Sequence, residues 1–453
     1  MDMKKKGFYR ASAAVVLSLS LALTACGKDG GTGTKPEDNG AKPAGTEKNT
    51  APVSLTMYQT GSSLSDEQFD IFVKALAEKM PYVTLKMVRD GTGTKPQDLI
   101  AAGTFPDIIY TANPKFRELQ NLKLIQNLDS FVKSKNVDLS IFDPQAIDTI
   151  RSYDAGKQLV AIPFSQNIGA LFYNKDILDK FGLPYPKDGM DWEQTLELAR
   201  KIARVDGGKQ FRGLEVTDAR HLGSALSLPW VNPANMTASI NTDGWKRVFQ
   251  LIRDTNNIPN NNVPAEEYGK GDDSFIKFQS VAMLPGWASG TSIKLEDAFK
   301  KGTVFNWDIV SLPNFKDSLG TGREYDIQAL MLSDTSKHKD QAFDVIQFLT
   351  SEYVQSIVTA KGKISAINTP EMQKKYASDL GSFKGKNIAG IFKTKSAKLN
   401  PPTEFDAIVI SSLGAITKRL VITNDDINTV MREQEEIANK QIEEEKVLLK
   451  NSK

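Results

Sequence analysis

The strongest constraint on the fold is an alternation of strand-like and helix-like segments that begins at residue 53. The run VSLTMY at 53–58 alternates side chains as a strand does, and residues 66–80 carry apolar side chains at helical spacing. A strand at 83–88, a short helix at 97–102 and a buried strand at 107–110 follow. Strands that alternate with helices are typical of parallel β/α layers. The sequence therefore predicts an α/β fold rather than a helical bundle or a sandwich.

The middle of the chain repeats this pattern with clearer boundaries. Strands are expected from residue 162 and over 169–173, and a helix over 174–181 ends at Gly182. Asp191 and Gln194 form a predicted capping box for the next helix, whose apolar face includes Trp192. We therefore expect Trp192 to pack rather than to bind.

The C-terminal half contains two further predicted helices and two predicted core tryptophans. A long amphipathic helix is expected over 338–361, and the last helix is expected to start at the Thr423-x-x-Asp426 box. Trp245 lies in a helical pattern and Trp307 in a strand pattern, so both are expected in the core.

Composition limits the kinds of chemistry open to the chain. The 453 residues include 57 Lys+Arg and 55 Asp+Glu, a net charge of +2, so no global field favours nucleic acid. A single cysteine excludes an intrachain disulfide, and only two histidines give little support for a metal centre. We expect no cofactor and no metal.

The N-terminus has the pattern of an exported protein. Lysines at 4–6 and Arg10 precede a charge-free stretch at 11–25, so residues 1–25 read as a signal peptide rather than a membrane span. The sequence Leu23-Thr24-Ala25-Cys26 resembles the lipobox of bacterial lipoproteins, which implies lipidation of Cys26. Residues 26–52 have no large apolar side chain after the cysteine and read as a flexible tether.

Four stretches then resemble one family in its order: 105–131, 162–183, 278–287 with 305–313, and 336–355. The family is that of the extracellular solute-binding lipoproteins of bacterial ABC importers, in its carbohydrate-binding branch (family 1). The resemblance implies a two-lobed periplasmic-binding-protein-like fold of type II, with a ligand cleft between lobes that close by hinge motion. Carried onto this chain, lobe one would take 53–163 plus 313–350, and lobe two 164–312 plus 351–453.

The resemblance also implies partners and a location. An ABC permease and ATPase would receive the ligand, a lipid anchor would hold the chain at the extracellular face of the bacterial cell membrane, and the protein would act as a monomer.

Candidate ligand residues are aromatic or polar side chains near the ends of predicted strands, where sugar rings and hydroxyls could be contacted. The two strongest candidates are Trp287 and Trp230. An arginine at position 323 would also suit an acidic sugar. The others are Phe164, Gln166, Asn167, Tyr58, Gln59, Thr60, Thr111, Asn113, Arg323 and Tyr325.

Three alternatives stay open at this point. The same receptor fold could hold a peptide, a polyamine or another small solute. A secreted glycan-degrading enzyme would need paired carboxylates, and the chain has no HExxH, GxSxG or Walker A motif. A structural surface lipoprotein would bind no ligand.

Overall fold

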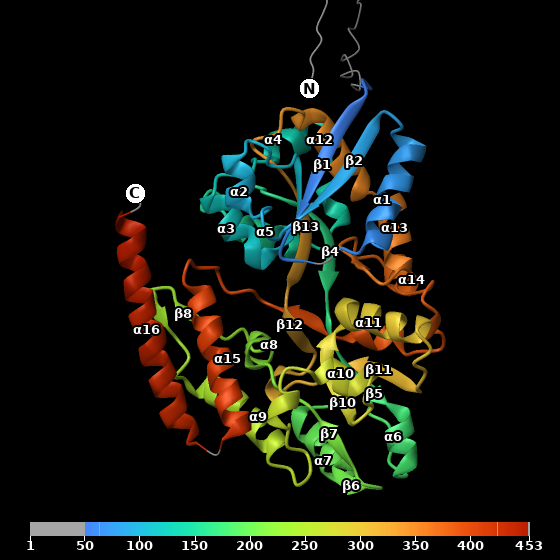
Figure 1. The fold of residues 1–453 in the computed structure, drawn as a ribbon, viewed down its shortest axis with the longest axis vertical. Helices are drawn as coiled ribbons and strands as arrows, with labels where there is room; N and C mark the ends of the chain where they lie inside the picture. The colour runs from blue at the N-terminus through green and yellow to red at the C-terminus, as the bar shows by residue number, and fades with distance from the viewer. Residues whose placement is uncertain (1–49, 63, 424, 452–453) are drawn as a thin grey trace, which may run out of the picture. The chain divides into compact units, whose positions relative to one another are not determined.

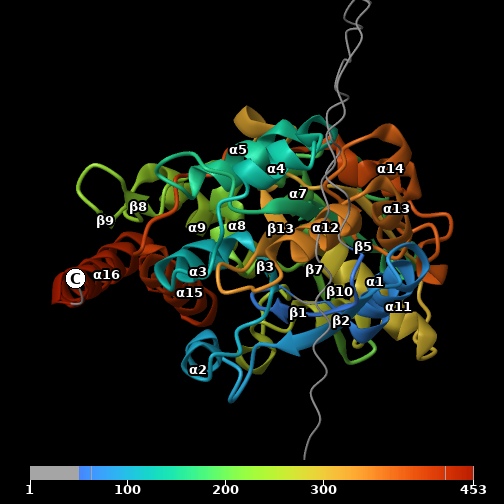
Figure 2. The same cartoon turned by 90° about the horizontal axis from the view of Figure 1, so that it is seen from above.

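A computed structural model describes residues 50–62, 64–423 and 425–451. Two separate sheets organise this part of the chain, and each is covered by helices (Figures 1 and 2). The predicted signal peptide, Cys26 and nearly all of the predicted tether lie outside the described residues. Within the described residues, no helix combines the length and the apolar character needed to cross a membrane.

The first lobe is built on a six-stranded sheet with the order β14-β4-β13-β3-β1-β2. Strand β1 pairs in parallel with β2 and β3, and β13 runs antiparallel to both β3 and β4. Its strands are β1 Val53–Gln59, β2 Val83–Arg89, β3 Ile108–Ala112, β4 Ile162–Asn167, β13 Asp326–Leu332 and β14 Ile364–Ser365. Its helices are α1 Asp66–Lys79, α2 Pro96–Ala101, α3 Phe116–Asn121, α4 Asp129–Ser134, α5 Pro144–Ser152, α12 Lys339–Leu349, α13 Glu352–Ala360 and α14 Pro370–Lys375, which contacts α13 and β14.

The second lobe is built on a five-stranded sheet with the order β11-β5-β10-β7-β6. Strand β10 pairs in parallel with β7 and antiparallel with β5. The strands are β5 Gly169–Asn174, β6 Arg204–Asp206, β7 Lys209–Leu214, β10 Val281–Trp287 and β11 Trp307–Ser311. The helices are α6 Lys175–Lys180, α7 Trp192–Ile202, α8 Ala219–Ser224, α9 Asp243–Asn256, α10 Gly271–Ile276, α11 Ala288–Lys300, α15 Asp406–Ile422 and α16 Ile427–Asn451.

Two small ribbons complete the second lobe. Strands β8 Val231–Asn232 and β9 Thr237–Ala238 form one of them, and β12 Thr321–Glu324 and β15 Lys395–Ala397 form the other. Strand β12 contacts α8, so it belongs with the second lobe, although β13 follows it after one residue.

The chain passes between the sheets at three places. The first is Ile168, between β4 and β5, and the second is Tyr325, between β12 and β13. The third follows Asp379, whose backbone N donates to the Ala360 carbonyl at the end of α13, and precedes Phe383, which packs against Trp307 of the second sheet. These points lie later than the predicted crossings near 163, 313 and 350. The reason is that β4, β13 and β14 are all hydrogen-bonded into the first sheet.

Core packing agrees with several predictions from the sequence. Trp192, Trp245 and Trp307 are buried, as expected. The predicted capping box of α7 is present, with Gln194 N donating to Asp191 Oδ1 over 2.8 Å. Local signals of this kind need only neighbouring residues, which explains why the sequence locates them well.

Two helix predictions were wrong. The helix expected over 338–361 is interrupted between α12 and α13 at Thr350 and Ser351, where Ser351 is extended and both hydroxyls bond to carbonyls of α12. The last helix starts later than expected, because Asp426 caps it by accepting from Thr429 N, while Thr423 ends α15.

Candidate ligand-binding site

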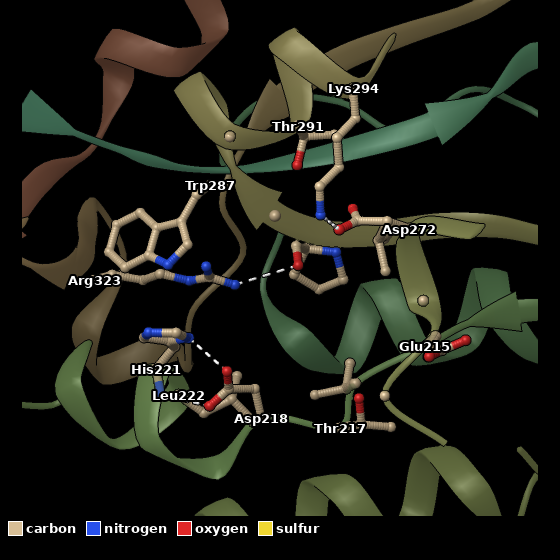
Figure 3. A pocket seen from close by; sticks show the side chains of 17 residues that line it. Glu215, Thr217, Asp218, His221, Leu222, Asp272, Trp287, Thr291, Lys294 and Arg323 are labelled. Carbon is tan, nitrogen blue, oxygen red and sulfur yellow. Dashed lines mark hydrogen bonds and ion pairs between the residues drawn. The ribbon is translucent and has the colours of Figure 1, made fainter. Parts of the chain in front are cut away.

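A hollow of about 340 Å³, the first hollow, lies at the edge of the second sheet (Figure 3). Strands β7 and β10 run in parallel, so the residues that follow β7 and those that end β10 reach the same edge. Glu215 and Asp218 come from the first of these segments and Trp287 from the second. Helices α8, α10 and α11 and strand β12 supply the remaining walls.

Trp287 lies in contact with two other side chains of the first hollow. The guanidinium carbon of Arg323 lies 4.7 Å from the centre of the indole, and the ring of His221 meets the indole edge-on at 5.0 Å. Arg323 also donates from Nη2 to the Pro285 carbonyl over 3.2 Å. Burial lowers the pKa of Arg323 to about 10, which still leaves it charged at neutral pH. The indole is thus held in a fixed orientation.

Asp218 and His221 form a second fixed pair in this hollow. His221 Nδ1 lies 2.6 Å from Asp218 Oδ2, and the other carboxylate oxygen accepts from the His221 backbone N at 3.2 Å. Burial lowers the pKa of His221, although Asp218 opposes the shift, so the ring is neutral at neutral pH. Burial would raise the pKa of Asp218, but His221 and Arg323 outweigh it and hold that pKa well below its usual range.

The remaining charges of the first hollow are also compensated within the protein. Lys294 pairs with Asp272 across the cavity. Glu215 pairs at 2.8 Å with the buried Arg212, which also pairs with Glu267 at 2.7 Å. Burial raises the pKa of Glu215 to about 6, although Arg212 opposes the shift. A ligand therefore meets hydrogen-bonding groups of both signs without a large net charge.

A second hollow, of about 190 Å³, lies on another side of Trp287. It shares Trp287 and His221 with the first hollow but not Arg323, and the first lobe contributes Gly61, Ser62, Ala112 and Pro114. The second lobe and the crossing strands contribute Arg220, Glu324, Asp326 and Gln328. Trp287 therefore stands where a ligand would touch both lobes.

A third hollow, of about 500 Å³, shares Pro114, Arg220 and Glu324 with the second hollow. Its walls come from α3 and the preceding turn in the first lobe, and from residues 399–410 and α16 in the second. Trp230 and Asn113 also line it. The second hollow therefore shares lining residues with both the first and the third.

Comparison with known proteins identifies the family to which this chain belongs. The model of the bacterial extracellular solute-binding protein family matches residues 62–356. The chain belongs to this family. Over 204 residues it is 26% identical to the Escherichia coli K12 protein YcjN, whose curated name is that of an ABC transporter periplasmic-binding protein. That match covers 44% of this chain and 46% of YcjN, so the chain spans about half the length of this curated relative.

Solved structures of low sequence identity share the fold of this solute-binding protein. An ABC substrate-binding protein from Listeria monocytogenes, solved with cycloalternan, is 17% identical with a TM-score of 0.70 over 86% of this chain and 98% of that one. The sugar-binding protein MalE from Xanthomonas citri is 18% identical with a TM-score of 0.68 over 88% and 99%. The predicted two-lobed α/β fold is confirmed.

Several residues predicted to bind ligand lie instead in the core of the solute-binding protein. Phe164 has no exposed surface and packs edge-on against Phe72 and Tyr110. Tyr58 is also fully buried, with its hydroxyl donating to the Thr94 carbonyl over 3.0 Å, and Tyr325 is 2% exposed. Their positions beside strand ends suggested a cleft, but their rings point into the first lobe. In this conformation the structure leaves them no surface for a ligand.

The polar candidates are mostly bonded within the framework. Asn167 Oδ1 accepts from Ser289 N over 3.1 Å, and Gln166 Nε2 donates to the Ser365 carbonyl over 3.3 Å, so both bridge segments near the crossing points. The others follow the same pattern: Thr60 donates to Asp90, Gln59 to the Ser62 carbonyl, Thr111 to the Ala112 carbonyl and Asn113 to the Tyr325 carbonyl. Of the twelve predicted positions, the three hollows bring together Trp287, Trp230, Arg323 and Asn113.

The sequence did not point to Glu215, Asp218, Asp272 or Lys294 as residues of the site. For Glu215 and Asp218 the sequence signal is weak. Both follow the strand 209–214, but this strand begins with two polar residues and is hard to recognise as a buried strand. Among the described residues, no group of three or more His, Cys, Asp and Glu side chains could hold a metal ion.

Because of Glu324, the free energy of unfolding should fall as pH rises. Burial raises its pKa from the ordinary 4.5 to about 7, although Arg220, 3.2 Å away, opposes the shift. The native protein therefore binds this proton more tightly than the unfolded chain, so the stabilisation is complete below about pH 4.5 and is lost as pH rises through 7. The loss should approach about 3 kcal/mol as an upper bound.

Melting curves between pH 5 and pH 8 check this prediction. Glu324→Gln should flatten the pH dependence relative to the wild type, whereas Glu197→Gln, at an exposed position of α7, should not. An unchanged slope in Glu324→Gln would contradict the assignment.

Proposed function

We propose that this solute-binding protein binds a carbohydrate, in particular an oligosaccharide, between its lobes and delivers it to an ABC importer. The position of Trp287 is the observation that carries the proposal. Its indole borders both the first hollow and the interlobe second hollow, and it is surrounded by hydrogen-bonding groups of both signs. A sugar ring offers an apolar C–H face to such an indole and hydroxyls to such groups.

The charge balance of the first hollow supports an uncharged, hydroxyl-rich ligand. Lys294 and Glu215 are each already paired with an opposite charge, and the positive charge of Arg323 acts on the carboxylate of Asp218 in the same hollow, so a charged ligand meets no large net charge of the opposite sign there. Carboxylates held in this way still accept hydrogen bonds from hydroxyl groups. Proteins of similar fold solved with cycloalternan or mannobiose, and the sugar-binding protein MalE, add support for a carbohydrate.

Lobe closure would turn binding into a signal for the importer. A ligand that touches both lobes stabilises the closed state by its differential affinity for that state. The crossings at Ile168, at Tyr325 and after Asp379 are the places where hinge motion would occur. Export through the signal peptide and lipidation of Cys26 would hold this receptor at the extracellular face of the membrane, beside the permease and ATPase.

A polyamine is the second candidate, and one observation favours it. Glu215, Asp218 and Asp272 all line the first hollow together with Trp287, and carboxylates beside an aromatic ring suit an alkylammonium. The internal pairing of these carboxylates favours the carbohydrate.

A thermal-shift screen of mono- and oligosaccharides, with polyamines, peptides and metal ions as controls, tests the proposal. A ligand at a hundred times its Kd should stabilise the native state by about 2.7 kcal/mol. Small-angle scattering with the best ligand should show a more compact protein, and chromatography should recover the sugar unchanged. A response only to polyamines, or hydrolysis of the sugar, would overturn the proposal.

A further inference from the structure

Three polar side chains near the second crossing face the second hollow. Glu324, Asp326 and Gln328 line this hollow, whereas Tyr325 and Ile327 between them pack in the core of the first lobe. Successive side chains of an extended chain point to opposite faces, so this alternation places residues 324, 326 and 328 on one face. The position predicted to bind ligand, Tyr325, is one residue away from the face that borders the hollow.

The amide oxygen of Gln328 is held by three donors inside the first lobe. Oε1 accepts hydrogen bonds over 2.8 Å from Tyr110 Oη, 2.7 Å from Ser165 Oγ and 2.8 Å from Lys363 Nζ. These donors come from β3, from β4 and from the segment before β14, and each of the three residues is at most 2% exposed. The oxygen is therefore fixed within the core.

Lys363 determines which end of the amide faces the core. An ammonium group donates hydrogen bonds and accepts none, so only the oxygen of the Gln328 amide can face Lys363 Nζ. The nitrogen Nε2 must then point the other way. Donors to the oxygen also polarise the amide, which makes its N–H groups stronger hydrogen-bond donors.

The amide nitrogen of Gln328 is a donor without an acceptor. Within the described part of the chain Nε2 donates to no group, and it is not among the unpaired polar atoms that are shielded from water. Gln328 is 7% exposed and lines the second hollow. An acceptor that arrives there with a ligand would therefore complete the hydrogen bonding of this amide.

The walls of the second hollow indicate which acceptor suits Gln328. A ligand carboxylate would lie beside the carboxylates of Glu324 and Asp326, and an alkylammonium has no lone pair with which to accept from Nε2. A hydroxyl oxygen is an acceptor without a charge. Trp287 of the second lobe lines the same hollow, so a sugar ring that lies on the indole could place a hydroxyl at Gln328.

We infer that Gln328 is a specificity-determining residue, whose Nε2 donates a hydrogen bond to a hydroxyl oxygen of the bound sugar. This inference rests on the proposed function, because it assumes that a sugar occupies the second hollow. It adds that the two lobes recognise different features of one sugar unit. Trp287 of the second lobe contacts the face of the ring, and Gln328 of the first lobe selects a hydroxyl at one ring position.

Calorimetry tests the inference with maltose and mannobiose, each compared with its monodeoxy and monodeoxyfluoro derivatives. Both kinds of derivative lack the hydroxyl hydrogen, but fluorine remains a weak acceptor, so the difference between them reports the acceptor role alone. At one ring position the fluoro derivative should bind the wild type about threefold or more tightly than the deoxy derivative. Gln328→Glu should reverse this order, because fluorine would then face a carboxylate oxygen.

The variant is designed to keep the interior of the first lobe intact. Gln328→Glu retains an oxygen for Lys363, and a melting curve of the unliganded variant checks that it folds. Gln441→Glu is the matched control, because Gln441 is exposed on α16 and lines none of the three hollows. Equal affinities of the fluoro and deoxy derivatives at every position, or an unchanged order in Gln328→Glu, would overturn the inference and leave the proposed function intact. Absence of binding by both disaccharides would overturn the inference together with the carbohydrate function on which it rests.

Hydrogen exchange in the unliganded protein is a second test, and it needs no variant. Gln166 is the internal reference, because its Nε2 donates to the Ser365 carbonyl over 3.3 Å and the residue is 6% exposed, much like Gln328. With isotope-labelled glutamine, the side-chain N–H groups of Gln328 should exchange about tenfold faster than those of Gln166, and the bound disaccharide should slow them. Equally slow exchange of both amides in the unliganded protein would contradict the inference, since Nε2 would then be closed to a ligand.

Discussion

Replacing Trp287 with alanine should weaken carbohydrate binding by about 30-fold or more, whatever the length of the sugar. The loss corresponds to about 2 kcal/mol, the scale of a central aromatic contact in a binding site. Trp287 borders the first and second hollows, so a ligand that enters either one loses its stacking surface. The variant also frees the guanidinium of Arg323, which lies against the indole in the unliganded protein.

Titration calorimetry on the sugar identified by thermal shift measures this effect. Trp287→Phe should recover part of the affinity because a smaller ring still stacks, and Phe278→Ala serves as the control for removal of an aromatic side chain. Trp287 is only partly buried, so the melting temperature of the unliganded variant should stay close to that of the wild type. Wild-type affinity in Trp287→Ala would place the ligand elsewhere.

The parts of the fold that the sequence predicted correctly depend on neighbouring residues. The strand and helix around residues 169–180 are marked by an apolar run, by Asn174 as the cap of α6 and by Gly182 at a φ of 63°. Each signal acts within a few residues, so a single sequence contains it. The break between α12 and α13 escaped prediction because no glycine or proline marks residues 350–351. Ser and Thr can also occupy helix interiors.

The crossing points depend on contacts that are distant in the sequence. Whether β4 joins the first or the second sheet is decided by its pairing with β13, more than 150 residues later, and strand periodicity is the same in either case. The same dependence on distant contacts explains why only some of the residues predicted to bind ligand line a hollow. Tyr58, Phe164 and Trp287 all lie in or directly after predicted strands, but only the tertiary structure shows which ring enters a core and which borders a hollow.

The site itself is assembled from side chains that no local motif connects. Arg323 reaches Trp287 because Gly169, at the start of β5, leaves room for its stem: a Cβ at this glycine would lie 3.0 Å from Arg323 Cδ. His221 and Asp218 are three residues apart and could have been recognised as a capping pair, whereas their contact with Trp287 could not. Contacts between neighbours in the sequence were therefore predictable, whereas the meeting of distant side chains around Trp287 was not.

Replacing Arg212 with methionine should destabilise the protein by about 3–5 kcal/mol, because it leaves a buried carboxylate without its partner. Arg212 is 1% exposed and pairs with Glu215, which is 2% exposed, and with Glu267. Methionine replaces most of the side-chain volume, so the loss reports the charge rather than a cavity.

The loss should be largest at pH 8 and smaller at pH 5, since the pKa of Glu215 is already raised to about 6 and must rise further without Arg212. Denaturant unfolding at both pH values measures this difference. Adding Glu215→Gln to the variant should restore part of the stability, which a double-mutant cycle quantifies. Lys277→Met breaks a solvent-exposed pair with Asp273 and should cost at most about 1 kcal/mol. If Arg212→Met were as mild as this control, or if its effect did not change with pH, the Arg212–Glu215 pair would not be what stabilises the wall of the first hollow.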